Sequence, residues 1–348
     1  MTSVRAGGRS LALAGARSPA RAWRCVLALA LLAARCDAPR VEAESSGADA
    51  RWPELQAALL AASAGAPLWL SQTGLYDDIA TQRFAGDLHE FRPRYALWSD
   101  GLEKRRWLHL PSGTQIDDRD ADHWQLPVGA LAFKEFSRNG QRLETRLIAR
   151  LGPGERDYWM GAFVWNPEQS DALFAPEGRD NALGSGHRVP SVQNCGACHH
   201  GAPGRVLGLS AVQAPELPRG WLRMPQQEPF VPPGNDTTRA ALGYLHANCA
   251  HCHNPRGSAR PDADLDLQLS VSDRTPEQTR AYQTAVGKPL QRFRAPGQRS
   301  RVARREPDAS ALLGRMSQRG DSAQMPPLGS GAVDLAGVAL VRAWIESL

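Results

Sequence analysis

Apolar and polar residues alternate most clearly in the middle of the chain. Residues 131–138 (LAFKEFSR) follow a period of roughly two, and a second run at 141–150 (QRLETRLIAR) comes directly after Asn139-Gly140. Asn-Gly between two such runs is typical of a type I′ turn, so the pattern predicts a β-hairpin. Residues 158–165 (YWMGAFVW) and 105–110 (RRWLHL) predict two further strands.

The region around these strands lacks a helical pattern of useful length. Residues 68–190 are therefore expected to form an all-β domain, an antiparallel sandwich or meander. Residues 44–67 are rich in Ala, Ser and Gly, and are expected to be a tether with one short helix near 52–62.

The pattern changes in the last third of the chain. A helix that Asp236 or Thr237 can cap is expected to end near Asn248, and Asp334 can cap a closing helix over 335–348. Apolar residues recur at helical spacing in that closing helix. This part of the chain is therefore expected to be mostly α-helical.

The N-terminus has the pattern of an export signal. Basic residues precede a short apolar stretch, 25–34, which is too short to span a bilayer. A small-x-small cleavage site at 41–43 predicts that 1–43 is a signal peptide and that the mature chain is periplasmic. Lipidation at Cys36 is the alternative, although Arg35 replaces the small residue that such a site prefers.

Charge and hydropathy argue against nucleic-acid binding and against a membrane span. The formal net charge is +5, but residues 1–43 hold seven arginines and two acidic residues, so the mature chain would be neutral. A nucleic-acid partner is therefore not expected. The sequence has no run of 18 or more apolar residues, so a transmembrane span is not expected either.

Cysteine usage points to the chemistry. Of six cysteines, two lie in the signal region, and the other four all lie in two Cys-x-x-Cys-His motifs. Two thiols one helical turn apart can bond the two vinyl groups of a haem, and the adjacent histidine can bind the iron. The sequence therefore predicts two covalently bound haem c groups, on Cys195, Cys198 and His199, and on Cys249, Cys252 and His253.

A zinc site built from the four cysteines is the alternative. Roughly 50 residues separate the two pairs, against about 15–20 in a zinc ribbon, and zinc would give no role to both histidines. With haem on both motifs, residues 191–235 become a first haem-binding segment with a Pro-rich linker. Residues 236–348 are then expected to be a cytochrome c-like domain with the second haem.

The sixth iron ligands are less evident than the attachment sites. Met325, in Gln-Met-Pro-Pro before the closing helix, is expected to bind the second haem iron and raise its reduction potential. The sixth ligand of the first haem stays unknown. Its candidates are two weak ones, Met224 and His187, and further loop histidines, His123, His109 and His89. An open site that could bind peroxide or oxygen is the alternative.

Ordered blocks of sequence along residues 70–348 add a resemblance. The blocks are 71–75 (SQTGL), 97–101 (LWSDG), 126–129 (LPVG), 134–136 (KEF), 144–147 (ETRL), 164–166 (VWN), 244–255 (YLHANCAHCHNP) and 325–330 (MPPLGS). With the first haem motif, they resemble a family of exported di-haem c-type cytochromes. The resemblance implies a periplasmic redox function and supports the cysteine, histidine and Met325 assignments. One departure is Gln213-Ala-Pro215, where relatives tend to have Gln-Leu-Asn.

Two functions follow as hypotheses. The first is an electron-transfer cytochrome that exchanges electrons with a redox partner protein. The alternative is a di-haem oxidase or peroxidase in which the first haem is the reaction centre. Asp100, Glu103 and Lys104 form a polar group between aromatic residues, which is expected to be a solvated turn, and catalytic residues stay unassigned.

Overall fold

The computed structural model describes residues 47–224, 228–293 and 296–348, which belong to one compact unit. The predicted signal peptide and the candidate lipidation site Cys36 lie outside the described residues. No helix within these described ranges is long and apolar enough to cross a membrane.

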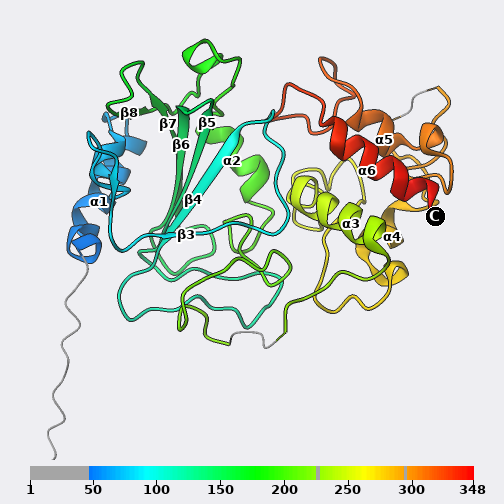
Figure 1. Cartoon of the computed structure of the whole chain (residues 1–348), viewed down its shortest axis with the longest axis horizontal. Coiled ribbons are helices and arrows are strands. Elements are labelled where there is room, and N and C mark those ends of the chain that lie inside the picture. The colour runs from blue at the N-terminus through cyan, green and yellow to red at the C-terminus, as the bar shows by residue number, and fades with distance from the viewer. Residues whose placement is uncertain (1–46, 225–227, 294–295) are drawn as a thin grey trace, which may run out of the picture. The chain divides into compact units, whose positions relative to one another are not determined.

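The central element is a six-stranded antiparallel sheet in which the strands follow chain order (Figure 1). Its strands are β3 (His89–Glu90), β4 (Glu103–His109), β5 (Leu131–Arg138), β6 (Gln141–Arg150), β7 (Tyr158–Trp165) and β8 (Ala172–Phe174). A separate two-stranded sheet consists of β1 (Tyr76–Asp78) and β2 (Arg83–Phe84). The predicted meander is therefore present, and its long strands fall where the alternation placed them.

The predicted hairpin joins β5 to β6. Asn139 and Gly140 both have positive φ, at 51° and 78°. A type I′ turn requires this conformation at both central positions, and Asn and Gly adopt it with the least strain. The turn and a register shift between Phe136 and Ser137 together set the register in which Lys134 lies opposite Arg146.

The two faces of the main sheet have different coverings. Helix α1 (Gly47–Ser63) packs Leu55 and Leu59 against one face, in a core that includes Phe133 and Trp165. Helix α2 (Val192–His199) lies beside the other face, next to β7 (Figure 1). The segment expected to be a tether thus contributes a helix to the core, because its leucines recur at helical spacing.

The described part of the last third of the chain contains four short helices: α3 (Asp236–Asn248), α4 (Arg280–Ala285), α5 (Ala311–Met316) and α6 (Leu335–Glu346). It also contains the single 3₁₀ turns η3 (Pro276–Gln278) and η4 (Pro307–Ala309), and two more, η1 (Leu70–Gln72) and η2 (Ala182–Gly184), lie earlier in the chain. The two predicted helices are confirmed, and Asp334 caps α6 by accepting a 2.9 Å hydrogen bond from the Gly337 amide. The predicted cap of α3, Asp236 or Thr237, is wrong, because Asn235 caps that helix by accepting from the Thr238 amide.

The predicted fold class, an all-β domain followed by a mostly α-helical cytochrome c-like domain, is wrong. The chain is mixed, with antiparallel sheets, two helices packed beside the main sheet and little helix overall. Among the described residues between α3 and α6, only two six-residue α-helices form, because Gly- and Pro-containing turns fill long stretches of this part. Local patterns identified the helices at either end, but they carry no information about the stretch between them.

Side-chain hydrogen bonds link the sheet region to the last third of the chain. Asn248, at the end of α3, accepts a 2.7 Å hydrogen bond from the Trp98 amide and donates to the Ala96 carbonyl at 3.1 Å. Asp100 accepts from the Ser330 hydroxyl at 2.7 Å and the Gly331 amide at 2.8 Å. These bonds hold the loop before β4 against the second motif and the segment after Met325.

Candidate functional site

The first motif occupies the short helix α2. Ser191 caps this helix in a reciprocal box with Asn194, in which each side chain accepts from the other residue's amide. Cys195 and Cys198 follow three residues apart on one helical turn, and His199 is the last residue of the helix. The cap therefore fixes where the turn that carries both thiols begins.

The orientation of His199 is fixed by a backbone hydrogen bond. Its Nδ1 lies 2.6 Å from the Arg205 carbonyl oxygen. A carbonyl can only accept, so Nδ1 carries the proton and Nε2 keeps a free lone pair. Burial lowers the pKa of His199 to about 4, which keeps the ring neutral at pH 7. A neutral histidine whose other nitrogen is held by a carbonyl is the usual form of a metal ligand.

Arg205 holds its carbonyl in place for this bond. It is a buried residue with φ 59°, a left-handed conformation that non-glycine residues rarely adopt. Its guanidinium donates to the Glu155 carbonyl at 3.1 Å and also to the carbonyls of His199 and His200. The loop is therefore locked to the C-terminal end of α2 at the point where the ligand histidine needs support.

A cavity of about 210 Å³ lies beside the first motif. Cys195, Cys198 and His199 line it, together with residues of the sheet, the 202–213 loop and the end of α3. Most of its sheet and loop wall is apolar and includes Ala132, Ile148, Met160, Val206 and Leu209. A largely apolar wall that includes both thiols and the histidine of the first motif suits the attachment of a flat, mostly apolar haem.

A buried charge cluster lies behind this cavity. Glu144 is fully buried and accepts from Arg146 at 2.5 Å and from His187 Nε2 at 2.7 Å. Desolvation tends to raise the pKa of Glu144, but the charge of Arg146 and the hydrogen bond from His187 outweigh it and lower that pKa. His187 also stacks on Phe136, with ring centroids 5.6 Å apart. The cluster fixes Arg146 at the cavity wall.

The second motif follows α3 directly. Cys249 is the C-cap residue of that helix, and the amides of Cys252 and His253 return to the Cys249 carbonyl at 3.1 and 2.9 Å. The His253 Nδ1 is buried without a hydrogen-bond partner. Burial lowers the pKa of His253 to about 4, so this ring is also neutral at pH 7. The second histidine thus has the protonation state of a ligand but lacks the fixed orientation of His199.

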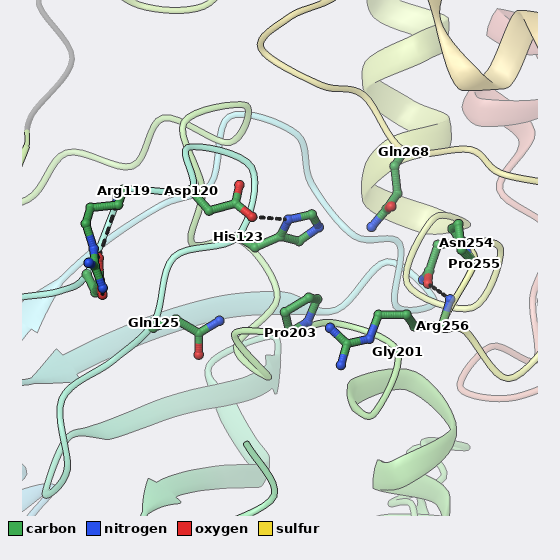
Figure 2. Close-up of a pocket in the computed structure, with 11 residues that line it drawn as sticks. Arg119, Asp120, His123, Gln125, Gly201, Pro203, Asn254, Pro255, Arg256 and Gln268 are labelled. Carbon is green, nitrogen blue, oxygen red and sulfur yellow. Dashed lines mark hydrogen bonds and ion pairs between the residues drawn. The ribbon is translucent and has the colours of Figure 1, made fainter. Parts of the chain in front are cut away.

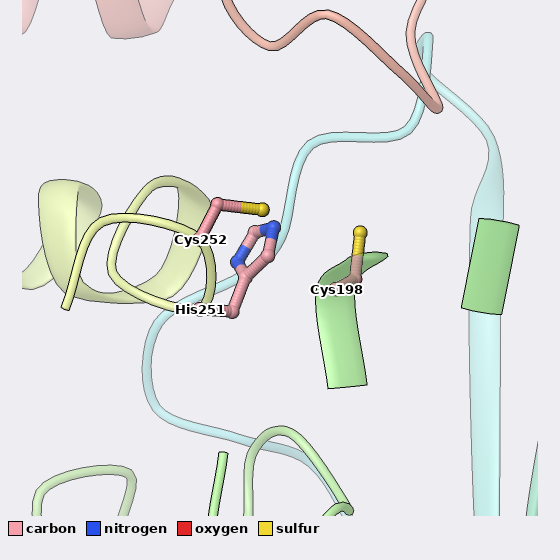
Figure 3. Close-up of side chains that lie close together, drawn as sticks. All are labelled: Cys198, His251 and Cys252. Carbon is pink, nitrogen blue, oxygen red and sulfur yellow. The ribbon is translucent and has the colours of Figure 1, made fainter. Parts of the chain in front are cut away.

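The two motifs meet in space. The ligand atoms of Cys198, His251 and Cys252 all lie within 4.8 Å of one another (Figure 3). The interaction between these two thiols lowers the pKa of Cys252 and raises that of Cys198. The backbones also approach closely, because a Cβ on Gly201 would lie 2.7 Å from the Gly257 Cα. One attachment thiol of each motif therefore faces the other.

Met325 and the second motif both have Arg315 as a neighbour. The Met325 amide donates to the Arg315 carbonyl at 2.9 Å, and the positive charge of Arg315 contributes to the lowered pKa of His253. Both residues are half-buried. This neighbourhood is compatible with iron ligation by Met325, which stays a prediction.

The candidates for the sixth ligand of the first haem are dispersed. Met224 is 61% exposed, and His187 is bound to Glu144. Neither lines the cavity, whereas His123, His246 and His251 do; His89 and His109 lie on β3 and β4 and do not line it either. His246 Nδ1 accepts a hydrogen bond from the Leu269 amide at 3.1 Å, so its proton is on Nε2.

A wider pocket of about 700 Å³ opens beside the cavity (Figure 2). His123 and Gln268 line both of them. Asp120 Oδ2 lies 3.1 Å from His123 Nδ1, so the His123 Nε2 is the nitrogen left for another partner. The wider pocket and the cavity beside the first motif are therefore adjacent at His123 and Gln268.

The comparisons with known proteins add no relative. No family model matches the chain, and no curated protein or solved structure shows significant similarity to it.

Sequence reasoning missed several residues of the site. The role of Arg205 depends on a tertiary contact and carries no motif. Asp100 was expected to lie in a solvated turn, yet it binds the segment after Met325. Arg106, Lys134 and Arg146 all fall in the predicted strands, but the sequence did not show that their side chains share one face.

Proposed function

We propose that the chain is an exported c-type cytochrome that attaches one haem at each Cys-x-x-Cys-His motif and transfers single electrons through the pair. The approach of Cys198 to Cys252 is the observation that carries the proposal. Motifs that bound haem independently would have no reason to place one thiol of each within 4.8 Å of the other. When bound, haem iron supplies one-electron chemistry between its ferrous and ferric states.

The residues of each motif have distinct tasks in this proposal. Cys195 and Cys198 would hold the first haem, and Cys249 and Cys252 the second. His199, held by Arg205, presents a neutral Nε2 towards the first iron site. The contact between Cys198 and Cys252 would bring facing edges of the two groups together. Redox partner proteins would supply and remove the electrons at the surface.

A second function rests on the pocket that shares His123 and Gln268 with the cavity. Access from the surface to the first motif is what a di-haem oxidase or peroxidase requires. In that case, the first haem would keep an open sixth site and the second would exchange electrons with it. A small molecule such as CO separates the two functions, because it binds only an iron with an open or weakly held site.

The test begins with the mature protein made together with haem maturation factors. Two haems per chain, one lost in Cys195→Ala/Cys198→Ala and the other in Cys249→Ala/Cys252→Ala, are expected from mass and absorption spectra. The reduced protein is then exposed to CO. An unchanged spectrum supports electron transfer, and one responding haem that is lost with the first motif supports the enzyme.

A chain that binds zinc in place of haem is the result that would contradict the proposal. Cys198, His251 and Cys252 could together bind a soft divalent ion such as zinc. A folded chain that carries stoichiometric zinc and no haem, even with maturation factors present, would contradict the proposal.

A further inference from the structure

Three cationic side chains stand in one row across the sheet. Arg106 on β4 lies directly opposite Lys134 on β5, and Lys134 lies directly opposite Arg146 on β6. Residues directly opposite in an antiparallel sheet present their side chains on the same face. All three line the cavity beside α2. The row therefore places three cationic groups along one wall of a largely apolar cavity.

Only one member of the row has a carboxylate partner. Arg146 binds Glu144 through two hydrogen bonds, of 2.5 and 3.1 Å. The Arg106 side chain is buried and Lys134 is half-buried. Within the part of the chain that the structure describes, neither side chain makes a hydrogen bond or ion pair, although Lys134 Nζ lies 4.6 Å from the centre of the Phe136 ring. Two cationic groups at the cavity are thus left uncompensated.

This arrangement costs stability. Like charges directly opposite in a sheet repel, and burial disfavours the charged form of each group. Burial lowers the pKa of Arg106 to about 10, and burial together with its cationic neighbours lowers that of Lys134 well below its usual value. Asp122 also lines the cavity, but no ion pair joins it to the row, and its Oδ1 accepts from the Val271 amide. An anionic ligand would offset this cost.

One end of the row lies nearer to the thiols of the first motif than the other end. Burial raises the pKa of Cys195 and the charge of Arg146 opposes that rise, which places Arg146 at the thiol end. Arg106 lies two strands further, about 9–10 Å away at the usual strand spacing. Lys134 therefore lies in the middle of the row, and Arg106 lies at the end away from the thiols.

Haem has the matching polarity. Its two vinyl groups, which bond the cysteines, lie on one edge, and its two carboxylates lie on the opposite edge. We infer that the row of Arg106, Lys134 and Arg146 is an anion-binding site, and that Arg106 and Lys134 bind the carboxylates of the haem held by Cys195 and Cys198. This inference rests on the proposed function. A free anion in the cavity would have the same chemistry, and the experiment separates the two sources.

The experiment compares Lys134→Gln and Arg106→Gln with Lys288→Gln, a control at an exposed lysine. Haems per chain are counted first in every protein. The reduction potential of each haem is then titrated across neutral pH, with and without added sulfate. A carboxylate that has lost its cation takes up a proton near neutral pH. One haem of Lys134→Gln and of Arg106→Gln should therefore gain a pH-dependent potential that the wild type and the control lack, with no effect of sulfate.

The other outcomes are distinct. A wild-type potential that shifts with sulfate, and no longer does so in Lys134→Gln, assigns the row to a free anion. Variants that match the control in both titrations overturn the inference. If the wild type carries no haem, the proposed function fails, and the row is tested by urea unfolding with sulfate. Sulfate should then stabilise the wild type and Lys288→Gln but not Lys134→Gln. Equal stabilisation of all three proteins would show that the row is not an anion-binding site.

Discussion

The two Cys-x-x-Cys-His motifs have the same spacing but different surroundings. The first lies on α2, beside a six-stranded sheet, and its His199 Nδ1 is held by the Arg205 carbonyl at 2.6 Å. The second begins where α3 ends and packs among short helices and turns, and its His253 Nδ1 has no partner. In the proposed cytochrome, the motif alone would specify attachment, and the surrounding fold would decide how firmly the ligand is oriented.

Unpaired buried atoms reinforce the contrast. In the described part of the last third of the chain, five buried polar atoms lack a hydrogen bond: His251 Nδ1, His253 Nδ1, Gln298 Oε1, Arg319 Nε and Trp344 Nε1. Each such atom costs about 1–3 kcal/mol. We infer that the first site is formed mainly by protein contacts and that the second depends more on its cofactor.

The largest effect is expected from Met325→Ala. If the thioether is the sixth ligand of the second haem, its loss opens that iron and lowers its reduction potential, because methionine ligation raises it. One additional CO should bind per chain, and the spectrum of the other haem should not change. Absorption spectra with CO and a redox titration measure both effects.

Met224→Ala is the matched control for this prediction. Met224 is 61% exposed, so its truncation should leave both spectra and both potentials unchanged. Should Met224→Ala change one haem while Met325→Ala changes none, the assignment of Met325 would be wrong and the first haem would have a methionine ligand.

The next effect concerns the support behind the first site. Glu144→Gln removes a fully buried carboxylate and leaves the half-buried Arg146 without a counter-charge. Loss of one partner of a buried ion pair costs about 3–5 kcal/mol. Urea unfolding of the haem-loaded protein measures this loss. Glu155→Gln, at a partly exposed pair with Arg256, should cost less than about 1 kcal/mol.

The pH dependence of the same pair has a defined sign. The folded-state pKa of Glu144 is lowered relative to the value of about 4.3 expected in the unfolded chain. Its contribution to stability is therefore present above about pH 4.3 and is lost as the pH falls through the lower folded-state pKa. The stability of Glu144→Gln should vary less with pH over that range. Parallel curves for both proteins would show that the pair contributes no such linkage.

A smaller effect is expected at the junction between the two regions. Asp100 accepts three hydrogen bonds from the segment after Met325, from the Ser330 hydroxyl and the amides of Gly331 and Ala332. In Asp100→Asn the side-chain NH₂ would face a backbone donor, and the charge would be lost. The expected cost is about 1–2 kcal/mol, with faster amide exchange at 330–332. Asp236→Asn, at an exposed ion pair, is the control and should change neither.

Local signals explain what could be predicted from the sequence. Asn139-Gly140 located the hairpin because a type I′ turn needs two residues with positive φ. Asp334 located the start of α6 because a cap acts within three residues. The predictions failed between α3 and α6, where no periodic pattern or cap indicates how the chain is packed. The fold class was wrong because those two confirmed helices were extended to the whole region.

Long-range features could not be predicted in the same way. The approach of Cys198 to Cys252 joins segments separated by roughly 50 residues, and no local rule specifies such a contact. The row of Arg106, Lys134 and Arg146 appears only once the register of three strands is known. The three charged residues were visible in the sequence of the predicted strands. The sequence did not show that their side chains meet on one face of the sheet.

The smallest expected effect tests whether the two motif helices depend equally on their caps. Asn235 Oδ1 accepts from the Thr238 amide at 2.9 Å, whereas the corresponding bond from Asn194 to Ser191 is 3.4 Å long. Loss of an N-cap costs about 0.5–2 kcal/mol, so Asn235→Ala should cost about 1 kcal/mol and Ser191→Ala less, as measured by urea unfolding. The shorter α2 can tolerate a weaker cap because the sheet and Arg205 already hold it. The reverse order would mean that the first motif relies on its local cap, and the contrast between a sheet-supported and a cofactor-dependent site would fail.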